Sequence, residues 1–472
     1  MKWLVYTRGL IQLYRIDMAY QAIHLWGSKL NGARTEDILH ATEGGHMWWC
    51  WNRKDIEALG KKILRSISTQ KGKTEHFKSL ERYLSESIRA SATIQRTQLE
   101  KLSDAQLESL FDWHFQKVGP AHAVLDPDVD SMDVVLERHL TRMIRRELRS
   151  KLTANEIVGA VKHLLVPVYR SYISEETLAV ARVEKSGWQK DNIDRLYRRF
   201  WWTTLGWERI HDMSRVQYEK RVRGFANDPD KLNYVKKHFS NVRRRRHVFL
   251  RELGISKRIR YWLEILDWYT AMHDKRKEMQ VKNVYAYRAL LKEVARRLGA
   301  SVHDLEWLTV DEVLQTLRSR KIPAAEIKRR SKALLVIVTK QKIAIYSGIS
   351  AIRRRKRELG ADDHARQVLK GMGVSVGVVR GRAKVCSGSL EAERKVKKGD
   401  ILVCGMTMPD YVPVMKRAAA VVTDEGGATC HAAIISRELG LPCVVGTKIA
   451  TRVFKDGERI EVDAGKGVVR KI

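Results

Sequence analysis

The chain has 472 residues, which is enough for two or three domains with sizeable cores. Its five cysteines form no CxxC pair, so we expect reduced thiols in a cytoplasmic compartment and neither a disulfide scaffold nor a zinc site. No run approaches the roughly 20 apolar residues that span a bilayer, and the N-terminus lacks the apolar core of a signal peptide. The net charge of +34 fits phosphate-rich ligands or nucleic acid, and it also fits a basic proteome or a hot or saline habitat, which we favour.

Residues 1–330 are predicted to form a mostly helical region. Three capping-box patterns, which begin at Ser103, Thr153 and Thr309, each place Gln or Glu three residues after a Ser or Thr. Residues 257–298 are predicted to form one long helix or two stacked helices that end at Gly299.

Two segments of this region have partial motifs. Residues 27–34 have Walker-like glycine spacing but lack the Lys-Ser/Thr pair that holds phosphate and Mg²⁺, so we expect a simple loop there. Residues 126–137 have carboxylates spaced as in an EF-hand, but Ser131 replaces the turn glycine. Because Gly119–Pro120 is expected to break the preceding helix, we interpret the acidic run as a loop and helix start rather than a calcium site.

Tryptophans cluster in the helical region, and two interpretations of them stay open. Such side chains usually belong to a core, where they bury a large area, but aromatic residues also line ligand pockets. The members of the clusters are Trp48, Trp49, Trp51, Trp201, Trp202, Trp207, Trp262 and Trp268.

Residues 331–370 are predicted to hold a short β-hairpin and a charged linker. The strands are expected at 333–338 and 342–346, followed by a charged helix near Arg353–Arg357. The stretch 358–370 then has the composition of a hinge for a mobile domain.

Residues 371–472 alternate predicted strands and helices. We expect helices at 411–417, capped by Asp410, and after the glycines of the segment 424–427. Strands are expected at 374–379, 382–386, 401–404, 418–422 and 443–445, with a closing hairpin at 459–463 and 468–471.

The stretch DEGGATCHAAIISRELGLPCVVG, residues 424–446, carries the strongest chemical signal. Gly426 and Gly427 allow a close backbone approach, and Thr429 is a good N-cap for the helix that follows. His431 therefore lies in the first helical turn, where outward N–H groups and the helix dipole favour an anion. This is a suitable place for a phosphoryl group on an imidazole; the alternative is a buried structural histidine.

At these residues the chain resembles the phosphohistidine, or swivelling, domain of the phosphoenolpyruvate-utilising enzymes. That family includes phosphoenolpyruvate synthase, pyruvate phosphate dikinase and rifampin phosphotransferase. Cys430 resembles the phosphoenolpyruvate synthase version, and a weaker resemblance covers residues 296–309. The matching positions are Gly426, Gly427, Thr429, His431, Ala433, Ile434, Arg437, Gly440, Pro442 and Gly446.

The resemblance implies a multidomain protein: a mostly α-helical N-terminal region at 1–330, an acceptor-binding or scaffold part, and a C-terminal α/β swivelling β/β/α phosphohistidine domain at 371–472. It implies His431, Thr429 and Arg437 as catalytic residues. Gly426, Gly427 and Cys430 would form the phosphate loop, and no metal ligands are expected.

The ATP-grasp and phosphoenolpyruvate-barrel domains of the family cannot be placed in this sequence. We therefore expect ATP and Mg²⁺ to be supplied through a partner, a separate ATP-grasp subunit, and the acceptor to be an unknown small molecule. The predicted function is a phosphotransfer component that carries a phosphoryl group on His431. The alternative is a non-catalytic basic helical protein that binds nucleic acid or a protein partner through runs such as Arg243–Arg246.

Overall fold

The computed structural model describes the chain apart from residues 1–2, 10–13, 44–45, 206–212, 227–228, 361–365, 408–410 and 428–429. The chain divides into two compact units. One unit consists of residues 12–36 and 54–323, and the other of residues 1–11, 37–53 and 324–472. The mixed helical and α/β architecture agrees with the predicted fold class at this level. None of the described helices is long and apolar enough to cross a bilayer.

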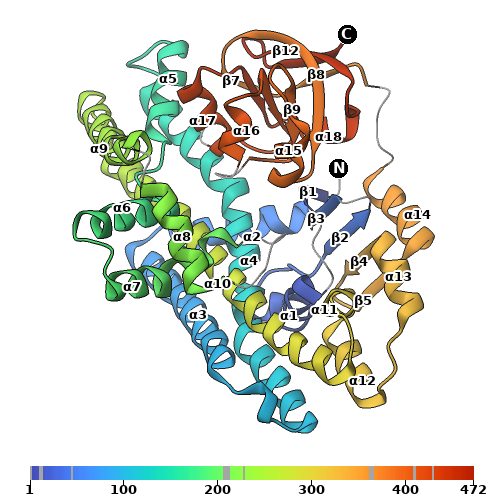
Figure 1. Cartoon of the computed structure of the whole chain (residues 1–472). Helices are drawn as coiled ribbons and strands as arrows, with labels where there is room; N and C mark the ends of the chain where they lie inside the picture. The colour runs from blue at the N-terminus through green and yellow to red at the C-terminus, as the bar shows by residue number, and fades with distance from the viewer. Residues whose placement is uncertain are drawn as a thin grey trace. The chain divides into compact units, whose positions relative to one another are not determined.

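The first unit is built from helices α1 to α12 (Figure 1). Two short 3₁₀ turns, Leu99–Lys101 and Trp201–Thr204, interrupt the series. The helices are α1 Tyr14–Asn31, α2 Arg53–Ser66, α3 Gln70–Arg96, α4 Asp104–Leu148, α5 Ala154–Leu164, α6 Tyr172–Lys185, α7 Lys190–Phe200, α8 Arg215–Ala226, α9 Pro229–Glu252, α10 Lys257–Leu298, α11 Val302–Leu305 and α12 Val310–Ser319.

The predicted helix starts in this unit are confirmed. Ser103, Thr153 and Thr309 each form a complete capping box with the residue three positions on, at the start of α4, α5 and α12. The long predicted helix is the single helix α10, and Gly299 ends it in the left-handed conformation. The N-terminal ends of these helices are therefore fixed by local side-chain bonds.

The prediction that Gly119–Pro120 breaks a helix is wrong, because both residues lie inside α4. The helix continues through Pro120 and Pro127. A Cβ atom on Gly119 would lie 2.2 Å from the ring of Trp26, so this glycine permits close packing against α1. Pro127 has no N–H for the carbonyl of Ala123, and Asn31 of α1 donates to that oxygen instead, at 2.8 Å. The packing of α1 thus compensates for a residue that normally ends a helix.

The acidic run is likewise helical, not a loop. Its four aspartates lie on α4, and each bonds a side chain of α10. Asp126 accepts from Gln280 at 2.7 Å, Asp128 from Tyr269 at 3.0 Å, Asp130 from Arg276 at 2.6 Å, and Asp133 contacts His273 at 2.7 Å. These carboxylates act as cross-links between two long helices, because buried polar groups need such partners.

The Walker-like segment also differs from its prediction. Residues 27–31 are the last turn of α1, whereas residues 32–34 are non-helical, as predicted for the whole segment 27–34. A Cβ on Gly27 would lie 2.6 Å from Oγ1 of Thr35, so the glycine allows a close contact within the unit. Its spacing therefore reflects helix packing.

A five-stranded antiparallel sheet in the second unit was missed in part by the sequence analysis. Only the hairpin of β4, Ala333–Val338, and β5, Ile343–Ser347, was predicted. The other strands are β1 Trp3–Gly9, β2 Ile38–Glu43 and β3 His46–Asn52, and the order is β1-β3-β2-β4-β5. The tryptophan cluster at 48–51 thus lies on β3, where Trp48 and Trp51 are buried. Helices α13 Ala324–Lys332 and α14 Gly348–Leu359 flank β4 and β5 in sequence.

Residues 368–472 form an eight-stranded sheet with short helices (Figure 1). Its order is β6-β13-β12-β8-β9-β10-β11-β7, and β8, β9, β10 and β11 run parallel to one another. The strands are β6 Val368–Lys370, β7 Met372–Ser375, β8 Val378–Cys386, β9 Ile401–Cys404, β10 Ala420–Thr423, β11 Cys443–Val445, β12 Arg459–Asp463 and β13 Val468–Lys471. The helices are α15 Ser389–Lys395, α16 Val412–Met415, α17 His431–Leu439 and α18 Ala450–Val453.

Of the parallel strands, β9, β10 and β11 are buried on both faces, as their almost unbroken apolar sequences require, whereas β8 is buried only near its C-terminal end. On β9 and β10, Val403 and Val422 join one core cluster, while Leu402 and Val421 join another that includes residues of α16 and α17. The predicted strand at 374–379 is wrong as a single strand. The chain leaves β7 at Ser375 and enters β8 at Val378, and Gly377 between them has φ +150.

Candidate functional site

The predicted phosphohistidine lies at the carboxyl end of the parallel strands. His431 is the first residue of α17, and its N-cap residue is Cys430 and not Thr429 as predicted. β10 ends at Thr423 and leads into the glycine loop, while Gly440 ends α17 in the left-handed conformation. The carboxyl edge of parallel strands is where open α/β sheets place their ligand sites.

Thr407 is the side chain that holds the imidazole. Its Oγ1 atom lies 2.8 Å from Nδ1 of His431. Thr407 is buried and follows β9, which runs parallel to β10 with Cys404 beside Thr423. The two loops therefore leave the sheet at the same edge, and this brings the hydroxyl to the ring.

The glycines of the loop meet tight steric demands. Gly426 has φ +112, and a Cβ there would lie 2.6 Å from Sγ of Cys430. Gly446 has φ +72, and a Cβ there would lie 2.8 Å from the carbonyl oxygen of Gly426. The carbonyl of Gly427 accepts the N–H of Cys430 at 3.2 Å. A side chain at position 426 or 446 would therefore force its neighbours to move, which explains why the motif has glycine at both positions.

A buried carboxylate anchors the start of the loop. Asp424 accepts hydrogen bonds from the backbone N–H of Thr451, at 3.0 Å, and from its hydroxyl. Burial raises the pKa of Asp424 to about 6, against the lowering effect of the Thr451 bonds. The backbone of the loop also bonds the end of β9, because the N–H of Asp424 donates to the carbonyl of Cys404 at 3.1 Å, and the N–H of Glu425 donates to the next carbonyl, that of Gly405, at 2.9 Å. The loop is thus fixed from two sides below His431.

The remaining predicted residues occupy different places. Burial raises the pKa of the Cys430 thiol, which therefore stays protonated at neutral pH. Arg437 is exposed on α17, and its Nε donates to the carbonyl of Val374 in β7 at 3.1 Å. Thr429 and the predicted cap Asp410 lie outside the described residues. The structure brings His431, Cys430 and Gly426 together; for Arg437 it records a backbone contact on β7.

Sequence reasoning missed Thr407 and the anchoring by Asp424. The sequence did contain a signal for Thr407. This residue follows a buried strand, β9, that is the parallel neighbour of β10, and the ends of parallel neighbouring strands meet at one edge of the sheet. Within the described part of the chain, no group of three or more His, Cys, Asp or Glu side chains is arranged to hold a metal ion.

The region that contains His431 matches a known family of domains. Residues 396–467 match the family described as PEP-utilising enzyme, mobile domain. The resemblance read from the sequence is thereby confirmed, and the chain carries a domain of this family.

The chain is similar over part of its length to curated members of the family. It is 54% identical over 125 residues to a probable phosphoenolpyruvate synthase of Archaeoglobus fulgidus, which is 26% of this chain and 16% of the relative. It is 58% identical over 109 residues to phosphoenolpyruvate synthase of Pyrococcus furiosus, covering 23% and 13% of the two chains. With rifampicin phosphotransferase of a Streptomyces species the identity is 35% over 196 residues, covering 40% and 22%. The chain thus covers much less than two thirds of these relatives.

Proposed function

We propose that this protein is a phosphotransfer component in which His431 carries a phosphoryl group between a donor and an acceptor. The observation that supports this most directly is the 2.8 Å contact between Oγ1 of Thr407 and Nδ1 of His431, beside a glycine loop and a helix start. A neutral imidazole attacks phosphorus with the lone pair of one ring nitrogen. The other nitrogen must then carry the proton and have a partner that holds it.

The Thr407 contact supports one assignment of these roles to the two nitrogens. In our proposal Nδ1 carries the proton and donates it to Oγ1 of Thr407, which leaves the lone pair on Nε2. Nε2 attacks the phosphorus atom of the donor, a P–N bond forms, and the P–O bond to the leaving group breaks. The N–H groups at the start of α17 and the helix dipole favour the added negative charge. Catalysis then rests on positioning and charge stabilisation.

We further propose that the donor is ATP with Mg²⁺ on a separate ATP-grasp subunit and that the acceptor is a small molecule. Within the Walker-like segment 27–34, residues 27–31 are the last turn of α1 with Gly27 close to Thr35, which supports the proposal that the donor binds elsewhere. The similarity to rifampicin phosphotransferase covers 40% of this chain, more than residues 371–472 can supply. It therefore extends into the preceding part of the chain, which supports an acceptor-related role for residues 1–330.

The test is phosphoryl labelling of purified protein. Labelled ATP alone should give little label, and ATP with cell extract from the same source should give label that is acid-labile and alkali-stable. His431→Ala should abolish the label, whereas Cys430→Ser should keep it because serine preserves the size of the N-cap side chain. Label that persists in His431→Ala would refute the carrier role. Robust labelling by ATP alone would refute the separate donor subunit and leave the carrier role standing.

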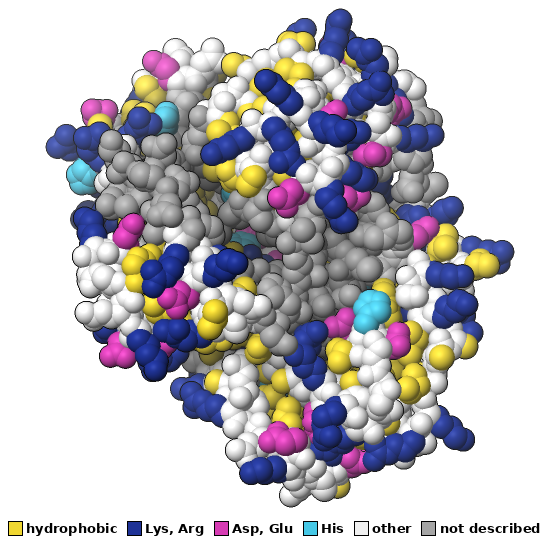
Figure 2. All heavy atoms as spheres, viewed as in Figure 1, with side chains coloured by type: hydrophobic (Ala, Val, Ile, Leu, Met, Phe, Trp, Pro, Cys, Tyr) yellow, Lys and Arg dark blue, Asp and Glu magenta, His cyan; other side chains and the backbone are white. Residues whose placement is uncertain are grey.

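The alternative of nucleic-acid binding has less support. In the two basic runs, Arg246 and Arg355 are buried and form ion pairs with Asp267 and Glu43. These arginines therefore serve the internal structure. On the face drawn in Figure 2, Lys and Arg side chains are scattered among Asp and Glu and do not form one continuous stripe. Steeply salt-dependent nucleic-acid binding that is lost on charge removal at Arg243–Arg245 would favour the alternative.

A further inference from the structure

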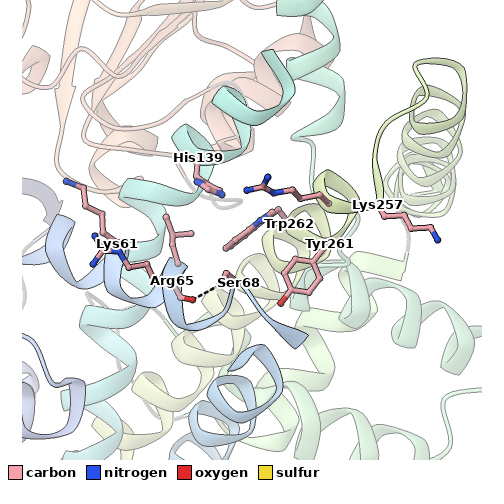
Figure 3. Close-up of a pocket in the computed structure, with 9 residues that line it drawn as sticks. Lys61, Arg65, Ser68, His139, Lys257, Tyr261 and Trp262 are labelled. Carbon is pink, nitrogen blue, oxygen red and sulfur yellow. Dashed lines mark hydrogen bonds between the residues drawn. The ribbon is translucent and has the colours of Figure 1, made fainter. Parts of the chain in front are cut away.

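The helical unit contains an open pocket of about 630 Å³. It lies where the C-terminal half of α2, the C-terminal third of α4 and the first two turns of α10 meet. Figure 3 shows Lys61 and Arg65 on one side and Trp262 and Tyr261 on the other. Its volume is within the usual range for small-molecule sites. The lining residues are Lys61, Leu64, Arg65, Ser68, His139, Lys257, Arg258, Tyr261 and Trp262.

The charge of the pocket is strongly one-sided. Its lining includes four cationic side chains and no carboxylate. Within the described part of the chain, Lys61, Arg65 and Arg258 form no ion pair, whereas the buried Arg246 is paired with Asp267. The first turn of α10 has no acidic residue, but the carboxylate of Glu147 accepts hydrogen bonds from the N–H and the hydroxyl of its N-cap Ser256, so the helix dipole there is offset and the positive field comes from the four side chains. The site therefore attracts anions.

His139 gives the pocket a hydrogen-bonding group that lacks a partner. Its Nε2 atom is buried and has no hydrogen bond to any described residue. Burial lowers the pKa of His139, and the nearby Arg142 and Arg258 lower it further. The neutral ring packs edge-to-face on Trp262, with 4.6 Å between ring centroids. A buried nitrogen without a partner is costly, and a small rotation of the ring toward the pocket would let a bound ligand oxygen satisfy it.

The base of the pocket is apolar and fixed. Trp262 is buried, and Leu64 and Tyr261 are half-buried. The hydroxyl of Tyr261 contacts the carbonyl oxygens of Ile67 and Thr69, at 2.7 and 2.9 Å, which holds its ring in place. An apolar or aromatic group would fit against this base, because the surface is already formed without a ligand.

We propose that this pocket binds an organic phosphate, with the phosphate among Lys61, Arg65 and Arg258 and an apolar or aromatic body against Leu64, Tyr261 and Trp262. Nε2 of His139 donates a hydrogen bond to a phosphate oxygen. Bidentate arginine contacts with phosphate oxygens supply both geometry and affinity. The proposed binding does not require phosphoryl transfer at His431, so the two proposals are tested by separate experiments.

Calorimetric titration of the full chain tests the site with three probes: 1-naphthyl phosphate, inorganic phosphate and 1-naphthol. We expect 1-naphthyl phosphate to bind tightest, because it alone has a phosphate for the cationic side chains and an aromatic body for the apolar base. Lys61→Ala/Arg258→Ala should weaken its binding roughly tenfold or more, since charge-assisted bonds are lost. Lys78→Ala/Arg89→Ala removes the same charge from exposed positions on α3 and should leave the affinity unchanged.

His139 provides a second readout. His139→Phe keeps the ring on Trp262 but removes Nε2, and it should weaken 1-naphthyl phosphate more than 1-naphthol. In the unchanged protein, bound phosphate should raise the pKa of His139 in an NMR titration, because an anion favours the imidazolium. Equal affinities in both double variants, or no binding of 1-naphthyl phosphate, would overturn the proposal. Preferential binding of single-stranded RNA that the pocket variant abolishes would overturn the small-ligand assignment.

Discussion

Thr407 and His431 come from two different loops, and the hydroxyl oxygen of one lies 2.8 Å from Nδ1 of the other. The contact fixes the orientation of an imidazole that the sequence motif alone only places at a helix start. Thr407 is 2% exposed, so its hydroxyl has little competition from solvent. It is a positioning residue for the proposed phosphoryl carrier.

Removal of this hydroxyl should slow phosphoryl loading. Thr407→Val keeps the shape of the side chain and removes the partner of Nδ1, so we expect a reduction of up to about tenfold, the value of one neutral hydrogen bond. Thr407→Ser keeps the hydroxyl and should load nearly as well as the unchanged protein. The rate of acid-labile labelling measures the effect, with thermal unfolding as a check on the fold. Equal loading by the valine and serine variants would contradict the positioning role.

Gly426 should be intolerant of any side chain. Gly426→Ala places a Cβ 2.6 Å from Sγ of Cys430 in a backbone conformation with φ +112, and such strain costs about 1–3 kcal/mol. Gly440→Ala is the matched control, because it also has positive φ but its Cβ would meet no atom within 4 Å. We expect Gly426→Ala to lower the free energy of unfolding more and to abolish labelling. The further change Cys430→Ala should restore part of the loss, and no such rescue would argue against the steric explanation.

Asp424 should make the stability of the mobile domain depend on pH. Burial raises its pKa from 3.8 to about 6, so the folded state holds the proton more tightly than the unfolded state. Its contribution is therefore fully present below about pH 4 and is lost as pH rises through about 6, on the order of 3 kcal/mol. Asp424→Asn should remove this decline, as measured by urea unfolding between pH 4 and pH 8. Glu393→Gln, on an exposed carboxylate of α15, should leave it in place.

The success of sequence analysis here depended on how local each interaction is. Ser103, Thr153 and Thr309 began helices where predicted, because each capping box lies within one helical turn. The segments 401–404 and 443–445 were predicted with the correct bounds, because strands buried on both faces are almost purely apolar.

Non-local pairings were beyond the sequence patterns. Strand β2 was missed because its pairing depends on β4, where Ile38 lies beside Val338. Thr407 was missed because its partner His431 is 24 residues away and meets it only across the edge of a parallel sheet. The helix at Pro127 was predicted as a loop, because the donor that replaces its missing N–H comes from Asn31 on another helix. In each case the deciding partner lies on a different element.

The segment between α14 and β6 should be the preferred site of proteolysis if the mobile domain swivels. Gly360 is exposed with φ +85, and Arg366 and Gln367 are exposed as well. Limited trypsin digestion should therefore cut at Arg366 before it cuts the exposed Arg243–Arg245 within α9, since helical backbone resists proteases. Mass spectrometry of the first fragments measures the order. Earlier cleavage within α9 would count against the hinge.

The contact of Arg437 with β7 allows two roles of this side chain to be told apart, one in phosphoryl transfer and one in stability. Its Nε donates to the carbonyl of Val374 at 3.1 Å, while the side chain as a whole is exposed. If the guanidinium contacts the acceptor during phosphoryl transfer, Arg437→Ala should slow transfer from phosphorylated His431 more than it slows loading. Arg437→Lys should then recover part of the transfer rate, because it keeps the positive charge. If the bond to Val374 is the main role, both variants should instead lower the free energy of unfolding by about 1 kcal/mol and affect loading and transfer equally. Pulse labelling with extract, followed by a chase with the small-molecule fraction of that extract, separates the two rates.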